Sequence, residues 1–237
     1  MAENATANMD LPLLMPAQAQ KHVTVNDALL RLDGQVDLVL QSLTRTTPPE
    51  VVADGLCWAV PQGAVNAWEG QAGKVAIGAN GGWVFFRPRF GKRALVADTG
   101  VPAIHNGTTW VEGAVSLGQH GSGLIVRQMA EDVTLGVGNT FTTTMVVPAG
   151  AMVVGVTARV LTAITGSLTS WTLGDTAVPN RFNENLGKAA NSWVRGMLGS
   201  PVTYWQPTAL RLGAAGGQFA GGRVRVVLHW WELRVPD

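Results

Sequence analysis

The sequence MPAQAQKHVTVNDALLRLDGQVDLVLQSL, residues 15–43, is the stretch of this 237-residue chain with the clearest helical spacing. Its apolar residues recur at alternating intervals of four and three, which is the heptad seam of a coiled coil. Thr24 and Asp27 are spaced like a capping box, Pro48 and Pro49 would end the helix, and Gly34 falls at the outermost heptad position. The seam consists of Val25, Leu29, Leu32, Val36, Val39 and Leu43.

This seam predicts a short coiled coil that joins three copies of the chain. Leucine at two of the three a positions, with valine at two of the three d positions, disfavours a two-stranded coil. Fewer than three heptads are marginal as a free coiled coil, so the domains that follow would have to support the assembly. We therefore expect a trimerisation helix over residues 24–47 and a homotrimer. The alternative is a single amphipathic helix that lies on a domain.

Residues 48–112 predict a small β-meander domain rich in tryptophan and glycine. The segments KVAIGANGGWVF and VPAIHNGTTWVE both contain a strand, an Asn-Gly turn and a tryptophan. Asn-Gly supplies the positive φ angles of a tight hairpin turn. We expect the domain's tryptophans to form its core rather than to serve as platforms for a ligand. They are Trp58, Trp68, Trp83 and Trp110.

The second half of the chain also predicts strands. Residues 113–123, GAVSLGQHGSG, are rich in glycine and predict a linker. Beyond it, apolar and polar residues alternate. The segment GGRVRVVLHWWELRV places Val224, Val226, Leu228 and Trp230 on one face and Arg223, Arg225, His229 and Trp231 on the other. The number of strands and their Gly/Pro turns predict a β-sandwich or jelly roll over residues 124–237. The whole chain is therefore expected to be mainly β with a short helical stalk.

Composition limits the possible partners. The formal net charge is +1 and no basic block is present, which argues against nucleic acid as a partner. The first ten residues, MAENATANMD, lack the pattern of a signal peptide, and no window resembles a membrane span. We therefore expect synthesis in a cytoplasm and no membrane insertion. The single cysteine, Cys57, excludes an intrachain disulfide and predicts a small buried hydrophobe.

The residue types of catalytic and metal centres are present but scattered. His22, His105, His120 and His229 have no partner at metal-ligand spacing, and the glycine-rich segments lack phosphate-loop spacing. We expect no metal, no cofactor and no enzymatic activity. The alternative is glycoside hydrolysis, which needs two carboxylates. Asp175 and Glu184 would be the first candidates for that pair.

Residues 175–207 are the most unusual part of the C-terminal half, because they mix aromatic residues with asparagine and arginine. Aromatic faces stack on the apolar faces of sugars, while amide and guanidinium groups bind hydroxyls and carboxylates. This mixture predicts a saccharide site on loops. The alternative is that the aromatic residues pack in the core or at a subunit interface. The candidate glycan-binding residues are Arg181, Asn183, Asn185, Trp193, Arg195, Tyr204 and Trp205.

Two segments resemble a family of uncharacterised phage and prophage proteins that also occurs among the fibre and spike proteins of gene transfer agents. The specific motif is PAQAQKHVTVNDALLRLD, followed by AWEGQAGKVAIGANGGWVFFRPRFGKRALVADTGVPAIHNGTTWV. The C-terminal portion, from VVGVTARVL to GGRVRVVLHWWEL, resembles the family's distal domain more loosely. The sequence departs from the family pattern near residues 178–193, where a tighter glycine-rich loop is usual.

This resemblance implies a structural protein on the surface of a phage or phage-like particle. It implies a homotrimeric tail fibre or head spike, with residues 1–23 attached to tail or head proteins and residues 124–237 bound to host surface polysaccharide. It supplies no catalytic residues. Two alternatives are a depolymerase of capsule or envelope polysaccharide and a purely structural adaptor within the particle.

Overall fold

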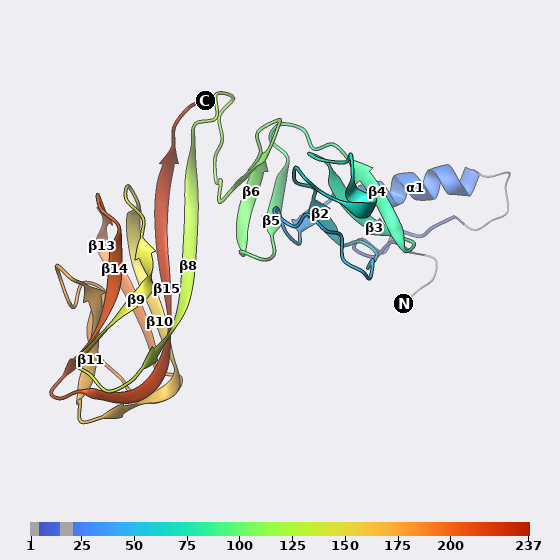
Figure 1. Ribbon diagram of the computed structural model, residues 1–237. Helices are drawn as coiled ribbons and strands as arrows, with labels where there is room; N and C mark the ends of the chain where they lie inside the picture. The colour runs from blue at the N-terminus through green and yellow to red at the C-terminus, as the bar shows by residue number, and fades with distance from the viewer. Residues whose placement is uncertain (1–4, 15–20) are drawn as a thin grey trace. The chain divides into compact units, whose positions relative to one another are not determined.

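The computed structural model describes residues 5–14 and 21–237, which form two compact units. The N-terminal unit comprises residues 1–123 with residues 235–237, and the C-terminal unit comprises residues 124–234. The chain is mainly β, as the sequence indicated, with one α-helix in the described residues. Figure 1 shows the strands of each unit.

The N-terminal unit contains a seven-stranded sheet in the order β4-β3-β2-β1-β5-β6-β7. The very short strand β1 lies at its centre and pairs in parallel with both β2 and β5. Two antiparallel meanders, β2–β4 and β5–β7, therefore flank β1 on opposite sides. The elements are α1 (Lys21–Asp33), β1 (Val39–Leu40), β2 (Cys57–Ala59), the 3-10 helix η1 (Asn66–Trp68), β3 (Val75–Ala79), β4 (Gly82–Phe86), β5 (Arg93–Val96), β6 (Val101–His105) and β7 (Trp110–Glu112).

The sequence repeat corresponds to the outer hairpin of each meander. Trp83 pairs with Gly78 across β3–β4, and Trp110 occupies the same place opposite His105 across β6–β7. The two tryptophans lie on opposite faces of the sheet. Trp83 packs edge-on against Trp58, whereas Trp110 packs on the cluster that contains Ile77 and Leu40. The repeat therefore fills both faces of one sheet.

The predicted helical stalk over residues 24–47 is wrong. Helix α1 ends at Asp33, and the chain then turns into the sheet, where Leu38 and Leu40 are buried while Val39 between them is exposed. That alternation has the period of a strand. Gly34 does not face solvent, because a Cβ there would lie 2.7 Å from the Cδ1 of Ile77. The six seam residues thus lie in a helix, a turn, a strand and a bend, and no continuous helix carries the predicted trimer interface.

The end of α1 is fixed by residues from the N-terminal segment. The buried carboxylate of Asp33 accepts hydrogen bonds from the Thr6 hydroxyl at 2.6 Å and from the backbone amides of Asn8 and Met9 at 3.1 and 2.7 Å. Asn26 exchanges two hydrogen bonds with the backbone of Leu14. Both polar residues belong to the motif quoted above, so part of that motif serves to hold residues 5–14. Residues 1–4 and 15–20 of the predicted attachment segment lie outside the described residues.

Cys57, the first residue of β2, is buried, as the sequence indicated. Burial, together with the nearby charge of Asp33, raises the pKa of its thiol to about 12. The side chain therefore stays a neutral thiol at physiological pH, and it packs as a small apolar group.

The C-terminal unit is a sandwich of two four-stranded sheets, in the orders β13-β10-β15-β8 and β12-β11-β14-β9. Eight strands distributed between two sheets in this order form a jelly roll. Figure 1 shows β8 and β15 as long neighbouring strands. The strands are β8 (Gly123–Leu135), β9 (Thr140–Val147), β10 (Met152–Gly166), β11 (Ser170–Asp175), β12 (Asn183–Leu186), β13 (Trp193–Thr203), β14 (Thr208–Ala215) and β15 (Phe219–Arg234).

The core of the jelly roll lies between its two sheets. Trp171 is fully buried, and its indole nitrogen donates a hydrogen bond of 3.0 Å to the carbonyl of Gly187, so its polar atom is satisfied. Phe141 and Phe219 meet edge-to-face near one end. The inward face of β15 contributes Val224, Val226, Leu228 and Trp230, the residues that the alternating sequence pattern placed together.

Candidate saccharide-binding face

The outer face of the β13-β10-β15-β8 sheet carries the most distinctive surface of the C-terminal unit. Strand register places Trp193, Arg159 and Arg225 in one row across β13, β10 and β15. The next row contains Arg195 and Thr157, with Val227 beside them. Residues directly opposite each other on neighbouring strands have Cβ atoms about 5 Å apart, so these rows form a continuous patch.

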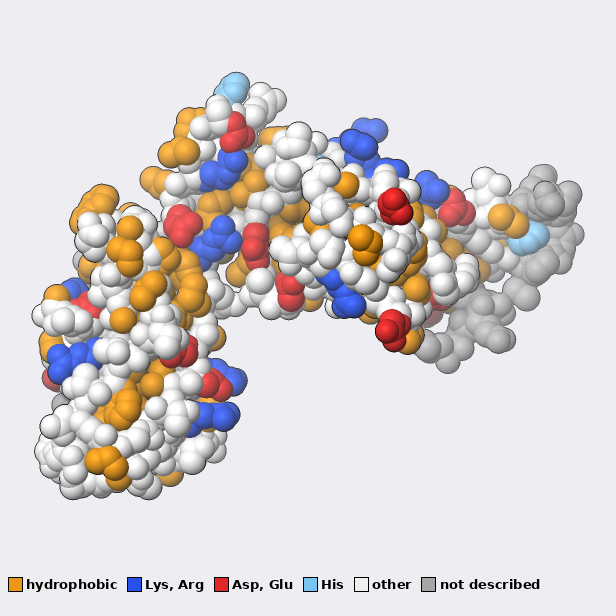
Figure 2. Space-filling view, in the orientation of Figure 1, with side chains coloured by type: hydrophobic (Ala, Val, Ile, Leu, Met, Phe, Trp, Pro, Cys, Tyr) orange, Lys and Arg blue, Asp and Glu red, His pale blue; other side chains and the backbone are white. Residues whose placement is uncertain are grey.

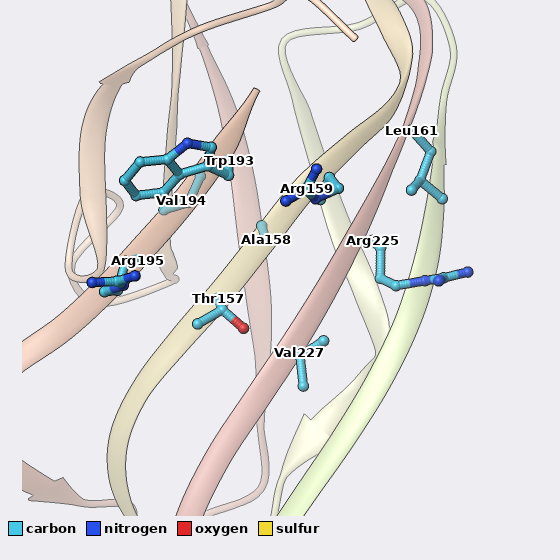
Figure 3. Close-up of a pocket in the computed structure, with 9 residues that line it drawn as sticks. All are labelled: Thr157, Ala158, Arg159, Leu161, Trp193, Val194, Arg195, Arg225 and Val227. Atoms are coloured by element: carbon cyan, nitrogen blue, oxygen red, sulfur yellow. The ribbon is translucent and has the colours of Figure 1, made fainter. Parts of the chain in front are cut away.

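This patch is a shallow groove with a volume of about 420 Å³. Figure 3 shows its side chains on three neighbouring strands, with the Trp193 ring and the Arg195 guanidinium projecting from β13. Its lining residues include no aspartate or glutamate. They are Thr157, Ala158, Arg159, Leu161, Trp193, Val194, Arg195, Arg225 and Val227. Figure 2 shows charged side chains of both signs scattered among hydrophobic and uncharged ones on the visible face of the unit.

Trp193 and Arg195 form an exposed stacked pair. The guanidinium carbon of Arg195 lies 5.7 Å from the centroid of the indole ring, within the range of a cation–π contact. Trp193 nevertheless remains 64% exposed, although its inward neighbour Val194 is buried in the core. Strand alternation explains this difference, since successive side chains of β13 point to opposite faces. The pair therefore stands on a rigid strand rather than on a loop.

The three arginines of the groove differ in their partners. Arg225 donates two hydrogen bonds, of 2.6 and 2.9 Å, to the carboxylate of Asp132 on β8. The hydrogen bond from Arg225 holds the pKa of Asp132 below its ordinary value. Within residues 5–14 and 21–237, by contrast, neither Arg159 nor Arg195 forms an ion pair.

His229 on β15 lies next to Thr157, one of the lining residues of the groove. Its Nε2 lies 3.0 Å from the hydroxyl of Thr157, and burial lowers the pKa of the imidazole. The ring is therefore neutral at pH 7, since the ordinary pKa of histidine is about 6.5. The positive charge of this face thus comes from its arginines.

A second group of predicted site residues serves the fold instead. The carboxylate of Asp175 is 1% exposed and accepts hydrogen bonds from the Tyr204 hydroxyl at 2.6 Å, the Val178 amide at 2.7 Å and the Arg181 guanidinium at 2.5 Å. Arg181 also lies over the ring of Tyr204, at 5.9 Å from its centroid. This cluster joins the end of β11 to the segment after β13, and it fixes the turn at residues 175–181 that leads from β11 to β12.

The pKa of Asp175 reflects two opposed effects. Burial raises it, but the hydrogen bonds from Tyr204, Val178 and Arg181 together outweigh burial and hold it below its ordinary value. Burial and the neighbouring carboxylate raise the pKa of Tyr204. The carboxylate is therefore ionised at neutral pH and the phenol is not.

The remaining predicted residues lie away from the groove. Asn183 and Asn185 are exposed on β12, which belongs to the other sheet. Trp205 is 77% exposed in the turn after β13. Glu184 is exposed and accepts a hydrogen bond of 2.8 Å from Asn180. The structure thus brings two of the seven predicted glycan-binding residues, Trp193 and Arg195, into the groove.

Sequence reasoning missed Arg159, Thr157 and Val227. They belong to strands far from residues 175–207 in the chain, and only the pairing of β10 with β13 and β15 brings them beside Trp193. The available signal was the alternation in VTARVL, which places Thr157 and Arg159 on one face and Ala158 on the other. That alternation identifies a solvent face but not the strand that lies next to it.

Two further observations concern the described residues as a whole. Across residues 5–14 and 21–237, no group of three or more His, Cys, Asp or Glu side chains could hold a metal ion. In the same part of the chain, no helix is both long and apolar enough to cross a membrane.

Comparisons with known proteins give one family match. A family model described as "Protein of unknown function (DUF2793)" matches residues 25–111, which extend from α1 to β7 in the N-terminal unit. No match was found among curated proteins. A solved chain described as "Cyanophage Pam1 capsid asymmetric unit" is similar at 23% identity, over 47% of this chain and 84% of that chain, with a TM-score of 0.31. A likeness at this TM-score defines neither fold nor function.

Proposed function

We propose that the protein is a surface component of a phage or phage-like particle, and that its C-terminal unit attaches the particle to a saccharide on the host cell. The observation that carries this proposal is the exposed Trp193–Arg195 pair over the groove on the outer sheet. The motif in residues 16–33, which resembles proteins of such particles, supports the particle assignment. A jelly roll is also an architecture of viral capsid and lectin domains, although an architecture alone does not define a function.

The groove has the physical features that saccharide recognition requires. An exposed indole offers an apolar surface for one face of a pyranose ring. Thr157 and the arginines surround it with a hydroxyl and with guanidinium groups, which can bind the hydroxyls at the edge of a sugar. These groups stand on paired strands, so little conformational entropy is lost when a ligand orders them. In this proposal the N-terminal unit contacts tail or head proteins of the particle.

The depolymerase alternative is weakened by the position of Asp175. Its carboxylate is buried and already holds three donors, so it is not accessible to a glycosidic bond. A pair formed by Asp175 and Glu184 therefore does not meet the requirement for two carboxylates that flank a sugar. A purely structural adaptor remains the competing hypothesis, and a binding experiment separates it from the proposal.

The experiment measures binding of the full chain to a panel of bacterial capsular and envelope polysaccharides and to intact bacterial cells. We expect binding to a subset of the panel. Trp193→Ala should reduce affinity by about 30-fold, because loss of a central aromatic contact costs about 2 kcal/mol.

Trp205→Ala is the matched control, since Trp205 is at least as exposed but lies outside the groove. It should bind like the unmodified chain. If the chain bound no polysaccharide and no cell, the adaptor hypothesis would replace the proposal. Equal binding by Trp193→Ala and the unmodified chain would remove the groove as the site.

A further inference from the structure

We infer that the groove binds an anionic saccharide and that Arg159, together with Arg195, binds its carboxylate or phosphate group. This inference rests on the proposed function, because it names the ligand class of the same face. It adds Arg159 as a specificity-determining residue.

The charge of the groove is only partly neutralised by the protein. Asp132 holds Arg225 through two hydrogen bonds and also lies 3.5 Å from Arg223, so β15 has its counter-ion on β8. Figure 3 shows the Arg225 side chain directed away from Trp193, toward the neighbouring strand. In the described part of the chain, Arg159 and Arg195 have no such carboxylate. Two positive charges therefore remain on the Trp193 side of the groove.

The positions of these two charges suit a ligand that stacks on Trp193. Arg159 is directly opposite Trp193 on the neighbouring strand, and Arg195 lies two residues farther along β13 on the same face. Figure 3 shows the two arginines on different sides of Trp193. A sugar on the ring would place its exocyclic groups beside one or both of them.

Guanidinium chemistry favours an anion among those exocyclic groups. The planar fork of arginine matches the two oxygens of a carboxylate or phosphate, and such charge-assisted bonds are about twice as strong as neutral ones. A neutral sugar would gain less, because its hydroxyls replace water at a guanidinium without adding an opposite charge. The absence of acidic residues among the described lining residues also removes a source of repulsion for an anion.

The test compares acidic polysaccharides with their own neutral derivatives. The probes are hyaluronan, alginate, polysialic acid and polyglycerol phosphate, with dextran and levan as neutral polymers. The three carboxylated polymers are also used after carboxyl reduction, which removes the charge but keeps the sugar backbone. We expect binding to one or more acidic polymers, loss of at least about tenfold in affinity on carboxyl reduction of a carboxylate ligand, and weaker binding at 0.5 M salt. The polyglycerol phosphate arm distinguishes phosphate from carboxylate recognition.

Substitutions of Arg159 then test its role in binding the acidic polymer. Arg159→Ala should lower affinity for the acidic polymer by about tenfold, the size expected for a hydrogen bond to a charged group. Arg159→Lys should bind between Arg159→Ala and the unmodified chain, because lysine keeps the charge without the planar fork. Arg223→Ala removes an equal charge from the same sheet outside the groove lining, and it should change affinity by less than about twofold.

Three other outcomes would overturn parts of the proposal. Equal affinity for an acidic polymer and its reduced form, or binding confined to dextran or levan, would overturn the anionic ligand class and leave the proposed function standing. An Arg223→Ala loss as large as that of Arg159→Ala would overturn the specific role of Arg159. Failure to bind any polymer or cell, with the unmodified chain folded by circular dichroism, would overturn the proposed function and this inference together.

Discussion

The C-terminal unit contains two arginine–aromatic pairs of similar geometry and different surroundings. Arg181 lies 5.9 Å from the centroid of Tyr204, and Arg195 lies 5.7 Å from that of Trp193. Beside the first pair is the buried carboxylate of Asp175, which accepts hydrogen bonds from both of its members. The second pair lies on an open sheet face with no carboxylate partner in the described residues.

This difference separates a structural cluster from a binding surface. In the first pair, the polar groups are satisfied within the protein, and their removal should cost stability. In the second pair, the polar group still has donors available to a ligand, and its removal should cost binding. An arginine and an aromatic residue thus serve two purposes within residues 181–204, and the two pairs differ in burial and in the presence of an acidic partner.

The largest expected effect on stability is that of Asp175→Asn. The change leaves the Arg181 guanidinium without its buried counter-ion, and we expect the free energy of unfolding of the C-terminal unit to fall by about 3 kcal/mol. Hydrogen exchange of β11 and β14 amides would measure it. Asp132→Asn is the control, since its ion pairs are exposed and should contribute less to stability than the buried pair of Asp175. Equal losses in the two variants would contradict the comparison.

The Asp175 cluster should also make stability depend on pH. The pKa of Asp175 is lower in the folded protein than the unfolded value of about 3.9, so the unfolded chain binds more protons in acid. Its stabilising contribution is therefore complete above the unfolded pKa and is lost as pH falls through the lower folded pKa. Urea unfolding between about pH 2 and pH 6 should show this loss, and Asp175→Asn should reduce it. An unchanged acid dependence in that variant would assign the effect to other carboxylates.

A smaller effect is expected from Tyr204→Phe. The substitution removes one of the three donors to Asp175 and preserves the ring that Arg181 covers. Loss of a hydrogen bond to a charged group should lower the free energy of unfolding by about 2 kcal/mol. Thermal unfolding of the full chain would measure the change. A variant as stable as the original would mean that the phenol hydroxyl contributes nothing to the cluster.

The smallest effect on stability is expected from Trp193→Ala, the variant with the largest expected effect on binding. Trp193 is mostly exposed, and its removal takes little apolar surface out of the core. We expect the free energy of unfolding to change by less than about 0.5 kcal/mol. A loss above about 2 kcal/mol would show that the ring is part of the fold, and the second pair would then resemble the first.

Local patterns in the sequence indicated the mainly β character of the chain. Alternation along residues 224–230 identified the buried face of β15, and the Asn-Gly repeat indicated two related hairpins. The heptad spacing was misleading because Val39, which it placed in the seam, is exposed, whereas Leu38 and Leu40 on either side of it are buried with the period of a strand. The heptad pattern placed Gly34 in solvent. Gly34 instead packs closely against Ile77, at the point where the chain leaves the helix.

The candidate site could be predicted only in part. Trp193 and Arg195 are two residues apart, so their common face follows from strand alternation once β13 is recognised. Arg159 requires the register between strands that lie more than thirty residues apart, and local periodicity contains no such information. The role of Asp175 likewise depends on Tyr204, a contact between positions 29 apart in the chain.

The short central strand of the N-terminal unit has a consequence for cooperativity. Only β1 connects the two meanders in the ladder of the described sheet, through Val39 and Leu40. The backbone amides of Leu95 and Ala97 donate to the carbonyls of Leu38 and Leu40, so their protection from solvent exchange reports on the central strand rather than on their own hairpin. If β1 opens locally, the two meanders lose their backbone link, and their amides can then exchange at different rates. The backbone pairing between the two meanders thus runs through two residues, while side-chain packing of Trp110 on the Ile77 cluster joins them as well.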